Sequence, residues 1–279
     1  MLVGASSASI LIVLLIFLFL GKEAFPFISR PGLGALWNFQ WIPVSFKREI
    51  FGIIPLLTGS FLVTFLATAL MIPFGVLGAV YIAEIAGRKE RVILKPFIEI
   101  LAGIPSVVIG FFGLVVLIPI LKNIFHLNTG LTALSGAILL ALMAIPTVIT
   151  ISEDAIRSVP KSFKEASLAL GASRVQTIFR VVVPTALPGI IAAVMLGIGR
   201  VVGETMVVLM VTGNAAKISF NPFGSVRTMT ATIAAEMGEV AFGSQHYQAL
   251  FWVGIVLLLV TFCLNYIAQK VLQKYRLDS

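Results

Sequence analysis

Residues 50–83 form a long uncharged run, IFGIIPLLTGSFLVTFLATALMIPFGVLGAVYIA, without a single Lys, Arg, Asp or Glu. A helix needs about 20 apolar residues to cross the roughly 30 Å hydrocarbon core of a bilayer, so this run is long enough to span a membrane. Five more runs lack these charged residues, namely residues 1–21, 100–121, 123–152, 181–199 and 240–269. The sequence therefore predicts an all-α, polytopic membrane protein with about six transmembrane helices.

The composition of the whole chain agrees with this fold class. Of the 279 residues, 59% are apolar and only 11% are charged, whereas a soluble domain carries about 25% charged residues. The formal net charge of +8 would suggest nucleic acid as a partner of a soluble protein. Here most of the basic residues flank the apolar runs, so we interpret them as determinants of membrane topology and expect no nucleic acid.

The first apolar run, residues 1–21, has no basic segment before it and no A-x-A-like cleavage site after it. We therefore expect a retained first span and not a cleaved signal peptide. The one cysteine, Cys263, lies in the last run, so no disulfide is expected within the chain.

Lys and Arg are unevenly divided between alternate connections. The 87–95 loop, the 152–180 loop and the C-terminal tail hold twelve of them, whereas the three intervening connections hold seven. Because cytoplasmic connections carry the excess of basic residues, the first set and both termini are predicted to be cytoplasmic. On the opposite side, residues 22–49 are expected to be irregular, and residues 228–237 (TMTATIAAEM) to form a short helix.

The polar segment 165–184, EASLALGASRVQTIFRVVVP, interrupts an otherwise apolar region. Gly171 is suited to the left-handed conformation that ends many helices, and Ser173 with Gln176 forms a capping-box pattern. The segment is therefore predicted to form two short helices that meet at Gly171. The small residues around this turn would let another protein approach the backbone. An amphipathic helix lying on the membrane surface is the alternative.

The spacing of this segment resembles the EAA loop of ABC-transporter permeases. Its pattern, E-A-A, three residues, G, nine residues and I-x-L-P, is matched by Glu165-Ala166-Ser167, Gly171 and Val181-x-Val183-Pro184, with Ser and two Val as departures. In that family the loop forms a coupling helix that fits a groove on a cytoplasmic ATPase. The resemblance implies ATPase coupling by Glu165, Ala166, Ser167, Gly171, Ala172 and Pro184.

Residues 54–87, 101–114 and 197–215 further resemble the PstC-type subunit of phosphate importers. This resemblance implies one permease domain over residues 1–279, with the cytoplasmic coupling loop at 152–180, in a bacterial or archaeal plasma membrane. It also implies inorganic phosphate as substrate. The implied protein partners are a second, PstA-like permease, two PstB-like ATPase subunits and an external PstS-like phosphate-binding protein.

No G-x-x-x-x-G-K-[ST] phosphate loop occurs in the chain. We therefore expect a transport subunit without an ATPase site or a cofactor of its own, and ATP with Mg²⁺ bound by the partner ATPase. His126 and His246 are isolated in the sequence, so no metal site and no catalytic set are predicted.

Arg200 and Glu204 lie in the segment GIGRVVGET (197–205), directly after a long apolar run. Because they are four residues apart, they would share one helix face and could pair. A charge within a membrane costs about 2.5–3.5 kcal/mol, so both side chains should face protein or water. We predict that Arg200, Glu204 and Thr205 line the substrate pathway, with arginine's planar fork suited to a tetrahedral oxyanion. A buried ion pair that only joins helices is the alternative.

Three other functions remain open from the sequence. The nearest is a permease for another oxyanion, such as molybdate or sulfate. A stand-alone secondary transporter would need neither ATP nor a partner. A membrane scaffold that reports phosphate status to a signalling protein could coexist with transport.

Overall fold

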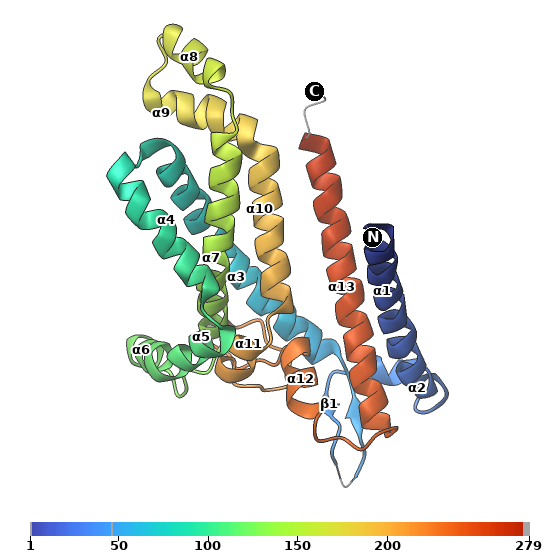
Figure 1. The fold of residues 1–279 in the computed structure, drawn as a ribbon. Helices are drawn as coiled ribbons and strands as arrows, with labels where there is room; N and C mark the ends of the chain where they lie inside the picture. The colour runs from blue at the N-terminus through green and yellow to red at the C-terminus, as the bar shows by residue number, and fades with distance from the viewer. Residues whose placement is uncertain (1, 46, 276–279) are drawn as a thin grey trace.

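The structure, a computed structural model, describes residues 2–45 and 47–275 and is mostly helical (Figure 1). The longer helices are α1 (Leu2–Ala24), α3 (Ile54–Val80), α4 (Arg88–Gly103), α7 (Ala133–Arg157), α10 (Val183–Gly203) and α13 (Gln245–Tyr275). The shorter helices are α2 (Pro26–Ser29), α5 (Ser106–Phe112), α6 (Ile118–Ile124), α8 (Lys161–Ala169), α9 (Arg174–Thr177), α11 (Met206–Val211) and α12 (Met229–Glu236).

Single irregular turns join or extend several of these helices. A 3-10 turn, η1 (Leu33–Trp37), precedes a small antiparallel hairpin of β1 (Trp41–Ile42) and β2 (Ile50–Phe51). The π-helical turns η2 (Tyr81–Ile85), η3 (Gly113–Leu117) and η4 (Ile178–Val182) continue the helices before them.

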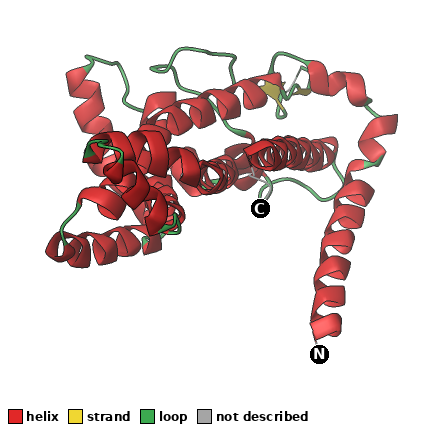
Figure 2. Ribbon diagram, turned by 90° about the horizontal axis from the view of Figure 1, so that it is seen from above, coloured by secondary structure: helices red, strands yellow, loops and turns green. Residues whose placement is uncertain are grey.

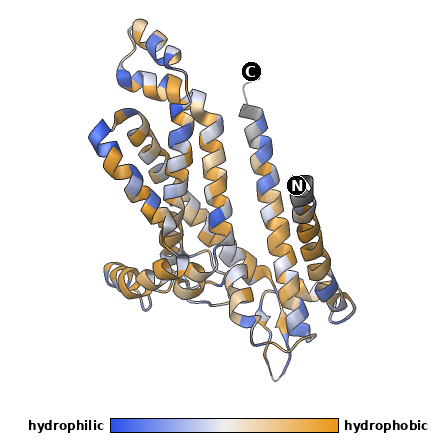
Figure 3. Ribbon diagram, in the orientation of Figure 1, coloured by the Kyte–Doolittle hydropathy of each residue, from blue (hydrophilic) through white to orange (hydrophobic). Residues whose placement is uncertain are grey.

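Six helical stretches in the described part of the chain are long and apolar enough to cross a membrane, which confirms the predicted fold class. They are Ser7–Ser29, Ile54–Ile85, Ser106–Ile124, Ala133–Arg157, Arg174–Gly203 and Gln245–Lys270. Figure 3 shows apolar residues along the middle of these helices and hydrophilic residues gathered on α8, α9 and the start of α4. The fourth span continues as α7 to Arg157, beyond the end of its uncharged run.

The core of the molecule is formed where α3, α7 and α10 meet. Gly75 of α3 lies so close to α7 that a Cβ on it would be 2.7 Å from a methyl group of Val148, and a Cβ on Gly197 of α10 would be 2.8 Å from another. Met71 fills the remaining space beside Gly197. Glycine is required at both contacts because only its backbone allows three helices to approach this closely.

At the end of the molecule that carries the β1–β2 hairpin, one carboxylate connects several elements. Glu236 of α12 accepts a hydrogen bond from the Trp41 indole at 3.0 Å, shares one with His246 at 2.8 Å and forms an ion pair with Arg227 at 2.7 Å. These contacts connect the hairpin, α12 and the start of α13. His246 is isolated in the sequence, because its partner is ten positions away and on another helix.

Helix α13 runs toward the end of the molecule where α8 and α9 lie, and α1 runs in the opposite direction (Figure 1). Helix α1 stands at the edge of the molecule, where Figure 2 marks its start. The short helix predicted at residues 228–237 is confirmed as α12.

Candidate functional site

Arg200 lies in the last turn of α10 and reaches two neighbouring helices. Its Nη1 donates to the hydroxyl of Thr147 on α7 at 3.1 Å, and its Nη2 lies 3.5 Å from the carbonyl oxygen of Ala102 on α4. In the described part of the chain, no carboxylate pairs with this guanidinium. Because its partners are neutral, the positive charge of this guanidinium is not neutralised by a counter-ion, and it can attract an anion.

The predicted pair between Arg200 and Glu204 does not form. Helix α10 ends at Gly203, and Glu204 has an extended backbone, so the two residues no longer share a helix face. The Glu204 carboxylate instead accepts from the backbone N–H groups of Met206 at 3.0 Å and Val207 at 3.4 Å. Those groups have no partner within α11, and a carboxylate at a helix start satisfies them. Capping of α11 therefore replaces the expected ion pair.

The bend after α10 is held by hydroxyl groups. Thr230 of α12 donates to the backbone carbonyl of Glu204 at 2.9 Å, and the Thr205 hydroxyl donates back to the carbonyl of Gly203 at 3.4 Å. Glu204 and Thr205 thus lie in the connection between α10 and α11, and their side chains bond to backbone groups there, not to Arg200.

The predicted coupling loop has the local structure expected from its sequence. Helix α8 ends at Ala169, and Gly171 takes the left-handed conformation with φ of 84°. The N–H of Ala172 reaches the carbonyl of Ser167, and the N–H of Gly171 reaches that of Leu168, which together form a Schellman motif. The Ser173 hydroxyl and the Gln176 side chain then form the capping box of α9.

The boundaries expected for this loop, 152–180, extend into the flanking helices. Residues up to Arg157 belong to α7, and the helix that leads into the next span begins with α9 at Arg174. From there α9, η4 and α10 follow one another without a break to Gly203. The turn at Gly171 is thus connected to Arg200 by continuous helix.

The six predicted coupling residues lie in three places along this segment. Glu165 and Ala166 are exposed on α8, whereas Ser167 is half-buried and shares a hydrogen bond of 3.0 Å with Thr177 of α9. Gly171 and Ala172 form the turn, and Pro184 lies exposed in the first turn of α10. Serine at the third EAA position therefore joins the two helices of the loop, a role that its size alone did not suggest.

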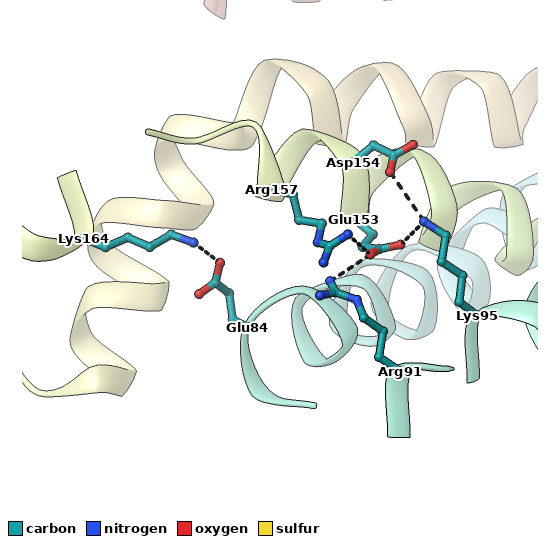
Figure 4. A network of polar contacts seen from close by, with 7 residues as sticks. All are labelled: Glu84, Arg91, Lys95, Glu153, Asp154, Arg157 and Lys164. Carbon is teal, nitrogen blue, oxygen red and sulfur yellow. Dashed lines mark hydrogen bonds and ion pairs between the residues drawn. The ribbon is translucent and has the colours of Figure 1, made fainter. Parts of the chain in front are cut away.

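Glu84, in the π-helical turn η2, contacts both helices of the loop, which its position in the sequence does not indicate. Its carboxylate is paired with Lys164 of α8 (Figure 4). The backbone carbonyl of the same residue accepts from Arg174 of α9 at 2.9 Å. Both partners lie 80 or more positions away, so no spacing rule could have found them.

An apolar pocket of about 480 Å³ opens between α3, α10 and α13. Phe61, Phe65 and Val202 contribute to its lining, and Arg200 does not. An anion would lose its hydration there without a compensating charge, so we do not assign the substrate to this pocket.

Comparison with known proteins assigns the sequence of this chain to a family. The sequence pattern of the family described as "Binding-protein-dependent transport system inner membrane component" matches residues 71–276. The chain belongs to this family of ABC permeases.

Similar proteins of known sequence and structure agree with this assignment. The permease is 42% identical over 227 residues to the "Probable ABC transporter permease protein YqgH" of Bacillus subtilis, covering 81% of this chain and 73% of that protein. It is 33% identical over 266 residues to the "Phosphate transport system permease protein PstC" of Mesorhizobium japonicum, covering 88% and 80%. A bacterial alginate ABC transporter solved with its periplasmic protein has the same fold, with a TM-score of 0.67 at 16% identity, covering 97% of this chain and 95% of the other.

A buried carboxylate near the coupling loop was not anticipated for the permease. Glu153 of α7 is 1% exposed and lies among Arg91 at 2.9 Å, Lys95 at 3.1 Å and Arg157 at 3.5 Å (Figure 4). Helix α4 has no buried residue of its own, so these ion pairs attach its first half to α7. The signal in the sequence was the acidic pair Glu153-Asp154 directly after an apolar run.

The turn at Gly171 offers a first test of the coupling loop. A Cβ at this position would meet nothing within 4 Å, so the cost of a side chain comes from its φ of 84° alone. We expect Gly171→Val to lower ATP-dependent uptake roughly 5- to 30-fold, because left-handed backbone costs about 1–2 kcal/mol for an ordinary residue. Gly171→Asn is the matched control, since asparagine tolerates this conformation. Equal uptake by both variants, measured in proteoliposomes, would contradict a role for this turn.

Proposed function

We propose that the permease is the subunit of an ATP-driven importer that forms half of the translocation pathway for inorganic phosphate. The observation that carries this proposal is Arg200, a guanidinium within a span that has neutral hydrogen-bond partners and no carboxylate among the described residues. The name of the PstC relative, a phosphate transport system permease, supports phosphate as the anion.

The chemistry of Arg200 suits a site that must both bind and release its substrate. Hydrogen bonds between a guanidinium and an anionic oxygen are roughly twice as strong as those to neutral acceptors. An arriving phosphate would therefore displace the Thr147 hydroxyl and the Ala102 carbonyl from the fork. When phosphate leaves, these two neutral groups are in position to take its place, which lowers the cost of release.

Movement of the coupling loop would reach this site through α10. The segment from Arg174 to Gly203 is continuous helix and carries Arg200 in its last turn. A displacement of the coupling loop by a partner ATPase would shift the guanidinium relative to Thr147 and Ala102, since these belong to α7 and α4. The site would thereby be exposed alternately to the two sides of the membrane.

This proposal implies a defined assembly and orientation. The α8 end and both termini would be cytoplasmic, in a bacterial or archaeal plasma membrane, and α8 would contact one of two PstB-like ATPase subunits that bind ATP and Mg²⁺. A PstA-like permease would complete the pathway, and a PstS-like protein would deliver phosphate to the hairpin end. The permease itself would bind no cofactor and hydrolyse no ATP.

Uptake of labelled phosphate into proteoliposomes tests the proposal. The assembled transporter is expected to accumulate phosphate only with ATP and Mg²⁺ at the ATPase face, and a tenfold excess of molybdate or sulfate is expected to leave the rate within about twofold. Strong competition by either ion would make the permease one for that oxyanion. Uptake without ATP would instead indicate a stand-alone transporter and would refute ATP coupling.

A further inference from the structure

We infer that Glu84 is a positioning residue for transport, a second attachment of the coupling loop that carries its movement into α3. This inference rests on the proposed function, because it concerns how movement at the ATPase face reaches the substrate pathway. The first attachment is the continuous helix that leads from Arg174 into α10.

Glu84 contacts both helices of the coupling loop at once. Its carboxylate pairs with the ammonium group of Lys164 on α8, with 12% and 26% of the two side chains exposed. Its backbone carbonyl accepts from Arg174 at the start of α9. The two contacts lie on either side of the turn at Gly171, so the loop is held to the end of α3 as one unit.

Few other contacts could hold α8 in place. None of its residues from Lys161 to Ala169 is buried, and the apolar side chains of Phe163 and Leu168 are each 49% exposed. Apolar packing on the spans therefore contributes little to its position. The pair between Glu84 and Lys164, together with the Ser167–Thr177 hydrogen bond, sets how α8 lies relative to the membrane helices.

The local structure around Glu84 suits this role. Residues Tyr81–Ile85 form a π-helical turn at the end of α3, and such turns are frequent at functional sites. Helix α3 in turn packs against α7 and α10 at Gly75 and Met71. A pull on Glu84 therefore acts on the same three-helix contact whose α10 member carries Arg200.

The test separates ATP hydrolysis from transport in the assembled transporter. We expect Glu84→Gln and Lys164→Gln each to lower phosphate uptake per ATP hydrolysed about tenfold, within the 5- to 150-fold range typical of coupling between two sites. ATP hydrolysis and co-purification of the ATPase should persist, since the loop itself remains folded. Exchange of the two charges, in Glu84→Lys with Lys164→Glu, should restore uptake to within about threefold of the natural protein.

Lys161→Gln is the matched control, because Lys161 is an exposed lysine on the same helix. If it lowers coupling as much as Lys164→Gln, contact of α8 with the ATPase explains the effect and Glu84 has no such role. Unchanged coupling in Glu84→Gln, or loss of assembly in both single variants, also overturns the inference. ATP-independent uptake by the natural protein would overturn the proposed function and this inference together, whereas the other outcomes affect Glu84 alone.

Discussion

Replacement of Arg200 by alanine is expected to lower ATP-dependent phosphate uptake by at least about 30-fold while the transporter stays assembled. The guanidinium is the charge that would compensate a phosphate for its lost hydration inside the span. Truncating one partner of a buried charged contact costs about 2–5 kcal/mol or more, and each 1.4 kcal/mol is roughly a tenfold change. Uptake into proteoliposomes and co-purification of the ATPase measure the two parts of this prediction.

The loss of uptake should depend on the planar shape of the Arg200 guanidinium as well as on its charge. Arg200→Lys keeps a cation but can donate to Thr147 and to an anion only as a point charge, so we expect an intermediate rate. Lys122→Ala, which removes an exposed cation from α6, is the control for net charge and should leave uptake near normal. Normal uptake by Arg200→Ala would exclude this residue from the pathway. Disassembly would instead assign Arg200 a structural role, holding α10 to Thr147 and Ala102.

The features that could be predicted from the sequence depend on neighbours along the chain. The six spans follow from uncharged runs of membrane-spanning length. The turn of the coupling loop follows from Gly171 and from the capping box of Ser173 with Gln176, which are local rules that the structure obeys. Local physics decides these features because the groups that satisfy each other lie within a few residues.

The features that the sequence did not predict depend on residues far apart in the chain. Glu204 was assigned to Arg200 by helical spacing, but that rule holds only while the helix continues, and the unpartnered N–H groups at the start of α11 provided a better site for the carboxylate. Glu84 and Glu153 have their partners on other helices. Sequence patterns identify charged residues that need a partner within the membrane, but tertiary packing determines which residue that partner is.

Loss of the buried carboxylate of Glu153 is expected to destabilise the permease strongly. Breaking a buried ion pair from one side costs about 3–5 kcal/mol, because the opposite charges remain without compensation. Here three cations would face one another, although Arg91, Lys95 and Arg157 are each partly exposed, so solvent screens part of the repulsion. We therefore expect the lower part of that range for Glu153→Leu, measured as a reduced unfolding temperature in detergent.

Two companion variants distinguish loss of the ion cluster from a general effect of mutation. Glu153→Gln keeps an oxygen that can accept from Arg91, so its loss of stability should be smaller than that of Glu153→Leu. Asp154→Asn removes the adjacent carboxylate, whose side chain is 66% exposed and makes a long contact of 3.8 Å with Lys95. It should change stability by less than about 0.5 kcal/mol. Equal losses in Glu153→Leu and Asp154→Asn would mean that the buried cluster does not hold α4. We expect the unfolding temperature to be lowest for Glu153→Leu, higher for Glu153→Gln and near normal for Asp154→Asn. This order would show that α4, which buries no residue of its own, is held to α7 mainly by charge.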